Sequence, residues 1–208
     1  MPLPLFLGPG VPIPLAAAAP GGGPAAGASV LNFNMQAQQQ EQWCWAAVAA
    51  SVSAFYSPPA NWVQCTIAGA CLNQDCCTDP SACNRTGDLD QALQKTGNYI
   101  NILPTPLPFT AVVGLSVTEE IDRQRVIGCR IGWEPGTDDL GHFTVIYGYD
   151  SANQDLDIGD PYYGPDVAGP AYGPYLTLPY DQFVQGYQSY PTARWTDYYP
   201  TKGSQDAA

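Results

Sequence analysis

The sequence predicts a single α+β domain in which the helices come first along the chain and the strands form an antiparallel sheet in the second half. Three observations support this expectation. An alanine-rich run at residues 43–52 stops before a proline pair, an amphipathic segment at residues 88–96 stops at a glycine, and strand-like segments begin near residue 126. We therefore expect a helical lobe over about residues 36–100 and a sheet lobe over about residues 110–200.

The predicted helices differ in character. Residues 43–52 (WCWAAVAASV) are nearly all small or apolar, which predicts a buried helix with Cys44 at its N-terminus. In residues 88–96, two leucines four positions apart predict an amphipathic helix, and the glycine that follows is a typical C-cap. A further helix is expected to start near residue 117, because two glutamates lie in what would be its first turn.

The predicted strands cover residues 126–133, 142–149 and 155–159, each of them bounded by Gly, Pro, Asp or Asn. The remainder of the chain, from residue 161 onward, is rich in Tyr, Pro and Gly and is expected to be mostly loop. One last strand is expected near residues 192–195.

Seven cysteines in 208 residues is heavy use for a reducing compartment. Five of them crowd into residues 65–83, which predicts disulfide bonds and a secreted protein. Zinc is the alternative, but its ligands usually come in closely spaced pairs and the only histidine is far away. The odd count leaves at least one thiol free, as a nucleophilic cysteine requires. The pairing stays open among Cys65, Cys71, Cys76, Cys77, Cys83 and Cys129.

Residues 1–30 are expected to be a Pro/Ala/Gly-rich leader, followed by the folded domain at residues 31–208. The small residues at 26–28 are typical of a signal-peptidase site. The absence of Lys and Arg and the repeated prolines favour a disordered leader instead, and both interpretations stay open. The rest of the chain contains no apolar run of about 18 residues, so no membrane-spanning helix is expected.

The formal net charge of -12 comes from 19 acidic and 7 basic side chains. Such a charge repels phosphate backbones and anionic headgroups, so neither nucleic acid nor a membrane is an expected partner. No cofactor and no metal ion is expected.

Three residues predict cysteine-based chemistry. A cysteine attacks as the thiolate, which a helix N-terminus and a neighbouring imidazolium both favour, and Cys44 has the first of these. The chain holds one histidine, so a Cys-His mechanism must use His142, which follows a glycine at a strand start. Asp160 closes the next predicted strand, where antiparallel pairing would bring it beside the imidazole as its orienting acceptor. Asp155 and Asp157 are alternatives for this role.

Around these residues the sequence resembles the papain-like cysteine peptidases, in particular the bacterial branch with the AvrRpt2-like and C39-like domains. Gln38 stands six positions before Cys44, as the oxyanion-hole glutamine of this family does. The motifs are WCWAA at residues 43–47, GHF followed by VIYGYD at residues 141–150, and IGDP at residues 158–161.

The resemblance implies a papain-like fold, with the nucleophile on the helical lobe and the histidine and acid on the sheet lobe. It implies that Cys44 is the nucleophile, His142 the general base and acid, and Asp160 the orienting acid. Gln38 would stabilise the oxyanion, with Gln36, Gln39, Gln40 and Gln42 as nearby alternatives. Papain itself has Asn where this chain has Asp160, although the C39-like branch commonly has Asp.

The expected activity is hydrolysis of peptide or protein amide bonds through a thioester acyl-enzyme. Two alternatives remain open from the sequence. The first is a non-catalytic interaction or adhesion domain on the same scaffold, which would use its aromatic C-terminal region as a binding surface. The second keeps the triad but changes the reaction to transglutamination, deamidation or the hydrolysis of non-peptide amides.

Overall fold

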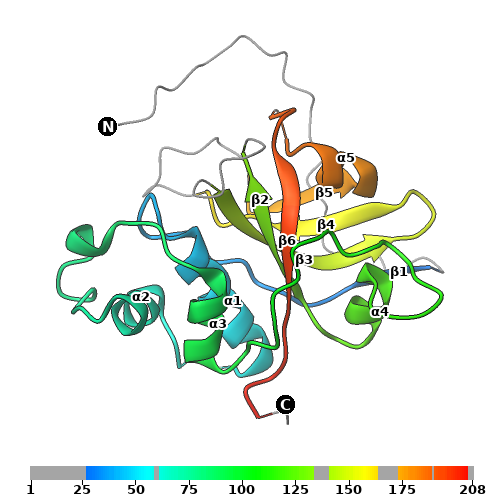
Figure 1. The fold of residues 1–208 in the computed structure, drawn as a ribbon. Coiled ribbons are helices and arrows are strands. Elements are labelled where there is room, and N and C mark those ends of the chain that lie inside the picture. The colour runs from blue at the N-terminus through cyan, green and yellow to red at the C-terminus, as the bar shows by residue number, and fades with distance from the viewer. Residues whose placement is uncertain (1–26, 59–60, 134–140, 164–172, 189, 206–208) are drawn as a thin grey trace.

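The predicted α+β class is confirmed by the computed structural model, in which a group of helices packs beside an antiparallel sheet (Figure 1). Residues 1–26 of the leader expected at residues 1–30 lie outside the residues that the structure describes. Those residues are 27–58, 61–133, 141–163, 173–188 and 190–205.

The helical part consists of α1 (Cys44–Tyr56), α2 (Gln64–Leu72), the short η1 (Ser81–Cys83) and α3 (Leu89–Thr96). The two helices expected here are confirmed as α1 and α3, and α3 ends as expected at a glycine with a left-handed backbone. Helix α1 packs against both α2 and α3 on one side and against the sheet on the other (Figure 1). Cys44 is its first residue.

The sheet has the order β5-β4-β3-β2-β6, with β1 paired to β3 outside this path, and the pairings among the described residues are antiparallel. The longest strand, β3, runs through the middle and starts at the expected histidine motif. The strands are β1 (Ala28–Val30), β2 (Ile127–Gly132), β3 (Gly141–Asp150), β4 (Asp155–Gly159), β5 (Tyr175–Pro179) and β6 (Arg194–Pro200).

Small side chains allow α1 and α3 to approach the sheet closely. From Ala46 to Ala50, α1 has no solvent-exposed residue, and four of these five residues are alanines. A Cβ atom on Gly128 of β2 would lie 3.1 Å from Leu89 of α3 and 3.2 Å from Tyr199 of β6. A larger residue at position 128 would push α3 away from the sheet, so this glycine helps to set the spacing between the two layers.

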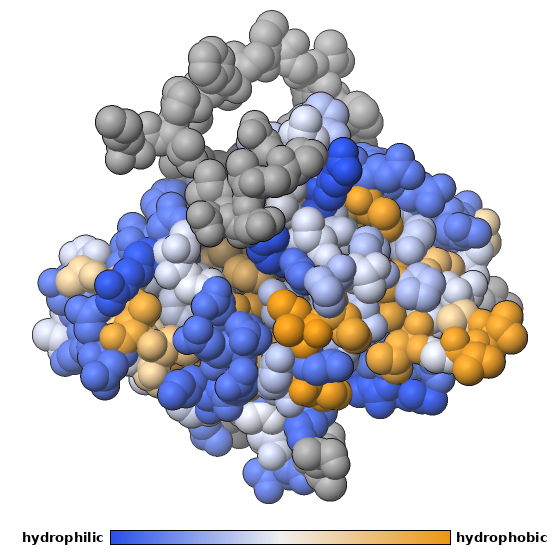
Figure 2. Space-filling view, in the orientation of Figure 1, coloured by the Kyte–Doolittle hydropathy of each residue, from blue (hydrophilic) through white to orange (hydrophobic). Residues whose placement is uncertain are grey.

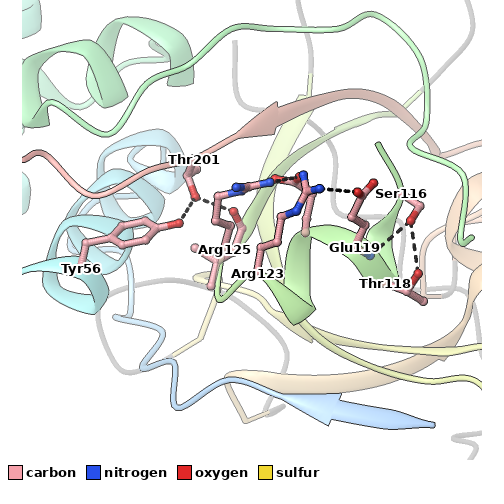
Figure 3. A network of polar contacts seen from close by, with 9 residues as sticks. Tyr56, Ser116, Thr118, Glu119, Arg123, Arg125 and Thr201 are labelled. Atoms are coloured by element: carbon pink, nitrogen blue, oxygen red, sulfur yellow. Dashed lines mark hydrogen bonds and ion pairs between the residues drawn. The ribbon is translucent and has the colours of Figure 1, made fainter. Parts of the chain in front are cut away.

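A polar network ties the end of α1 to the far ends of the sheet strands (Figure 3). The hydroxyl groups of Tyr56 and Thr201 are 2.8 Å apart, and Thr201 also donates to the carbonyl oxygen of Val126. Burial raises the pKa of Tyr56 to about 12, so its hydroxyl stays protonated. Nearby, Arg125 forms an ion pair with Glu120, whose side chain is almost fully buried. This network fixes the helical part relative to the sheet on the side away from Cys44.

Helix α4 (Val117–Asp122) follows the same region and begins where a helix start was expected. The Ser116 hydroxyl accepts a hydrogen bond from the backbone N–H of Glu119, which is a typical N-cap. Glu119 in turn pairs with Arg123 one turn later (Figure 3).

The C-terminal quarter is more regular than the sequence predicted. Residues expected to be loop form β5 and the short helix α5 (Tyr180–Gln185). The last strand, expected near residues 192–195, is longer and starts later, as β6. Its register against β2 shifts by one residue between Arg130 and Ile131, which marks a bulge. At the other end of the chain, residues 28–30 of the expected leader form β1, so the sheet begins before residue 31.

Exposed apolar side chains are scattered among the described residues. The most exposed are Val112 and Val113, at 102% and 91%, on the loop before α4. In the view of Figure 2 the apolar side chains form separate patches between hydrophilic ones. Within the described ranges, no helix has the length and hydropathy needed to cross a membrane.

Candidate functional site

Cys44 lies at an open helix N-terminus. The residue before it, Trp43, makes no side-chain capping bond, and the first turn of α1 contains no acidic residue. The backbone N–H groups of a first helical turn have no partner within the helix, and they carry the positive end of the helix dipole. The Cys44 thiol is free and half-buried, so it can meet both a substrate and this positive end.

Two tryptophans flank the cysteine and anchor it to the disulfide-bonded segment. The indole N–H of Trp43 donates to the carbonyl oxygen of Cys83 at 2.8 Å, and that of Trp45 donates to the carbonyl oxygen of Arg85 at 3.2 Å. Between them, the Asn84 side chain accepts a hydrogen bond from the backbone N–H of Gln42 at 2.9 Å. The start of α1 is therefore held by three hydrogen bonds to residues 83–85.

Disulfides hold that segment in turn. Cys76 pairs with Cys83, and Cys65 on α2 pairs with Cys77. The expectation of disulfides is thus confirmed, and the cluster keeps one unpaired member, Cys71. Cys129 is free and fully buried in β2, as its place in a predicted strand suggested.

His142 and Asp160 come from neighbouring strands. His142 is the second residue of β3, and Asp160 directly follows β4. The Nε2 atom of His142 and the Oδ1 atom of Asp160 are 2.7 Å apart, and each side chain is 9% exposed. The structure therefore brings together the histidine and the acid that the sequence singled out.

Cys44 lies close enough to the imidazole to affect it. Burial lowers the pKa of His142, but the charge and hydrogen bond of Asp160, together with the influence of Cys44, outweigh it and raise the pKa to about 10. At neutral pH the ring is held as an imidazolium beside the carboxylate.

Asp160 is saturated with donors. Its Oδ1 atom also accepts the backbone N–H of Tyr162 at 2.8 Å, and its Oδ2 atom accepts the hydroxyl of Tyr187 at 2.5 Å and the amide of Gln188 at 3.2 Å. Burial raises the pKa of Asp160, but His142 and these donors outweigh it and lower the pKa below its ordinary value. The group is thus a buried carboxylate with four hydrogen-bond donors around it.

The two alternative acids lie elsewhere. The Asp157 carboxylate accepts a hydrogen bond from Thr177 of β5, and Asp155 pairs in register with Pro179 at the end of the sheet. In the described part of the chain, the carboxylate that bonds to the His142 ring is that of Asp160.

Aromatic rings surround the imidazole. The ring of Trp133, just after β2, stacks on His142 with centroids 6.0 Å apart and an interplanar angle of 16°. Tyr162 approaches edge-on at 6.2 Å. Such rings exclude water and strengthen the interaction between the imidazolium and the carboxylate.

Gln38 is buried beside the turn that leads to Cys44. Its backbone N–H donates to the carbonyl oxygen of Pro161, which joins this segment to the turn after Asp160. Its amide nitrogen donates to the carbonyl oxygens of Gln40 and Glu41, at 3.0 and 2.8 Å, and its Oε1 atom has no partner. Among the five glutamines weighed, Gln38 is the buried one.

Sequence reasoning missed Trp133 and Tyr187. Their partners lie 9 and 27 positions away along the chain, as the residue numbers in these contacts show. The only available signal was that aromatic residues are frequent near the C-terminus, which does not identify single residues. Among the described residues, no group of three or more His, Cys, Asp or Glu side chains could hold a metal ion.

Comparisons with known proteins identify the family of this chain. Residues 30–199 match the model of the Peptidase_C39 like family, which covers most of the chain and confirms the resemblance. One solved structure, digestive procathepsin L 3 of the Tenebrio molitor larval midgut, aligns with a TM-score of 0.46 and 10% identity. The alignment covers 86% of this chain and 71% of that one. The search of curated proteins gives no match.

Proposed function

The chain belongs to the Peptidase_C39 like family, and on this premise we propose that it hydrolyses peptide or protein amide bonds through a thioester on Cys44. Membership of the family supports cysteine peptidase activity in general. The observation that supports the specific mechanism is the position of His142, which bonds to Asp160 and has its pKa raised by Cys44.

In the first half of the reaction, the Cys44 thiolate attacks the carbonyl carbon of the substrate and forms a tetrahedral oxyanion. The open N–H of Cys44 at the start of α1 is one donor to that oxyanion. As the intermediate collapses, the C–N bond breaks and the His142 imidazolium gives its proton to the leaving amine. The product is an acyl group bound to sulfur as a thioester.

In the second half, neutral His142 takes a proton from water, and the resulting hydroxide attacks the thioester. The C–S bond breaks, the acid product leaves, and the thiolate–imidazolium pair returns. Asp160 keeps its charge throughout, because its role is to orient the ring and to stabilise the imidazolium. No cofactor takes part in these steps.

The second oxyanion donor proposed is the side chain of Gln38. In the structure its amide nitrogen bonds to two backbone carbonyls, so this role requires one of those bonds to be exchanged for the substrate oxygen. Its burial and its link to Pro161 support a place between the nucleophile and the acid.

The proposal includes export from the cytoplasm, which the two disulfides support. The substrate class follows from the family and is a protein or peptide chain. The net charge of -12 argues against nucleic acid as a partner.

The test compares Cys44→Ala with Cys71→Ala. Both replace a free, half-buried cysteine, but of the two it is Cys44 that raises the pKa of His142. With a peptide library as substrate, we expect Cys44→Ala to lose cleavage by a factor on the order of 10⁴ or more while its unfolding transition is retained. Cys71→Ala is expected to keep the wild-type rate. Retained cleavage in Cys44→Ala would refute the mechanism.

The same assay separates the alternative functions. Ammonia release from side-chain amides with intact backbones, dependent on Cys44, would replace peptidase activity by deamidation. A wild-type protein without turnover, whose free cysteines are all alkylated slowly, would favour the interaction domain.

A further inference from the structure

A turn after α5 contacts both Asp160 and the aromatic ring that covers His142. Its described residues are Tyr187, Gln188 and Tyr190, and two backbone hydrogen bonds, at 2.9 and 3.2 Å, join Tyr187 and Tyr190. Both residues face the site, but they contact different members of it. This inference rests on the proposed function.

On one side of the turn, Tyr187 holds Asp160. The Tyr187 side chain is buried, its ring packs edge-on against Phe183 of α5, and its hydroxyl donates to Asp160 at 2.5 Å. Burial, followed by the negative charge of Asp160, raises the pKa of Tyr187 well above its ordinary value, so the phenol stays a donor. The oxygen it binds, Oδ2, is the one that His142 leaves free.

Gln188 contributes the second donor to the same oxygen, at 3.2 Å. Its φ angle is 53°, a left-handed conformation that is unfavourable for a non-glycine residue. Such backbone strain persists only where the surrounding structure enforces it. Here the strained residue, Gln188, directs its side-chain amide toward the buried carboxylate of Asp160.

On the other side, the turn supports Trp133. The ring of Tyr190 lies 5.0 Å from that of Trp133, and the hydroxyl of Thr192 donates to the Trp133 carbonyl oxygen at 3.0 Å. Trp133 is the ring that stacks on His142. Tyr187 therefore contacts Asp160 directly, whereas Tyr190 and the nearby Thr192 contact the tryptophan that stacks on the imidazole.

We propose that the described residues of this turn position the His142–Asp160 pair, and that Tyr187 is the main one. Tyr187 does not touch the reacting sulfur, so it acts through Asp160. Its donor hydrogen bond lowers the pKa of Asp160 and fixes the carboxylate plane, and the carboxylate then orients the imidazole toward Cys44.

The decisive variant is Tyr187→Phe, which removes one hydroxyl and keeps the ring. The matched control is Tyr180→Phe in the preceding short helix α5, where the Tyr180 hydroxyl donates to the Leu107 carbonyl oxygen and not to the site. We expect Tyr187→Phe to lower kcat about tenfold with little change in KM. We expect Tyr180→Phe to keep the wild-type kcat.

The pH profile gives a readout that a merely structural role would not move. The titratable groups that face Asp160 are His142, Tyr187 and Tyr162, with Cys44 beyond the ring. Loss of the Tyr187 donor raises the pKa of Asp160, so the acid limb of kcat/KM is expected to move to higher pH in Tyr187→Phe. In Tyr180→Phe the limb is expected to stay in place.

A third variant covers the case in which Tyr187→Phe does not fold. Gln188→Gly removes the amide donor and relieves the left-handed strain, so its melting temperature is expected to equal or exceed that of the wild type. Its kcat is expected to fall severalfold. Full kcat in this variant, or in a folded Tyr187→Phe, would overturn the proposal.

Iodoacetamide alkylation of Cys44, followed across pH by peptide mass spectrometry, needs no substrate. If the wild type cleaves nothing but its alkylation profile shifts in Tyr187→Phe alone, the peptidase proposal fails and the role of the turn stands. If cleavage is normal and neither the alkylation nor the kcat/KM profile shifts, the role of the turn fails and the peptidase proposal stands.

Discussion

His142 donates a 2.7 Å hydrogen bond to Asp160 across the β3–β4 boundary, and both side chains are 9% exposed. Two opposite charges so close and so well buried influence each other strongly, and water screens them little. The pair therefore affects the stability of the fold as well as its chemistry.

The first prediction concerns stability against pH. The pKa of His142 is about 10 in the folded chain, above its ordinary value of 6.5. The folded state thus binds this proton more tightly. The contribution of His142 to stability is fully present below pH 6.5 and is lost as the pH rises toward 10. For Asp160, whose pKa is lowered, the contribution is present above 3.8 and is lost as the pH falls through the folded value.

Urea unfolding of the wild type and of His142→Gln checks this sign. The difference between their unfolding free energies follows the histidine together with its effect on Asp160, whose pKa His142 lowers. We expect this difference to be largest near pH 6 and to shrink toward pH 10. A difference that stays constant or grows over this range would contradict the raised pKa.

The second prediction concerns the disulfides. Replacing both cysteines of a pair by serine should cost about 2.5 kcal/mol for Cys76–Cys83 and about 3 kcal/mol for Cys65–Cys77, because the second closes the longer loop. The loss of activity should follow the opposite order and be larger when Cys76–Cys83 is removed. Only the first pair includes a residue whose carbonyl oxygen holds Trp43.

We expect loss of Cys76–Cys83 to lower kcat on the order of tenfold, because the start of α1 loses its anchor. Loss of Cys65–Cys77 should change kcat less in spite of its larger cost in stability. Steady-state kinetics of both double variants measure the loss of kcat, and urea unfolding measures the loss of stability. If kcat falls in proportion to stability in both, the anchoring role is wrong.

The third prediction concerns Gln38. If its amide stabilises the oxyanion, Gln38→Ala should lower kcat on the order of 10²-fold with a smaller effect on KM. Gln39→Ala is the control, since that neighbouring side chain is exposed. A loss confined to stability, with normal kcat, would mean that Gln38 only holds the turn through the carbonyl oxygens of Gln40 and Glu41.

The helix of Cys44 and the strand of His142 were predictable because each carries its own local signal. Alanines with a proline stop indicate α1, and a run of mostly apolar and aromatic residues bounded by Gly and Asp indicates β3. The place of Asp160 followed from strand pairing. Each of these signals is local, so the sequence could propose Cys44, His142 and Asp160 as the centre of the site.

The surroundings of the site were not predictable in the same way. Helix α5 has six residues, too few to show a periodic pattern, and it lies in a stretch whose Pro and Gly content indicates loop. Trp133 and Tyr187 meet the site only after four strands have paired, and nothing in their local sequence marks them. Likewise, the choice of Cys71 as the unpaired member of its cluster depends on tertiary distances.

Three of the five tryptophans lie around the site. Trp43 and Trp45 flank the sulfur with both indole N–H groups hydrogen-bonded, and Trp133 covers the imidazole. Indole emission responds to nearby charge and polarity, so the protein carries built-in fluorophores at its reacting groups. Binding of a peptide or modification of Cys44 should therefore be visible as a change in intrinsic fluorescence, with no label attached.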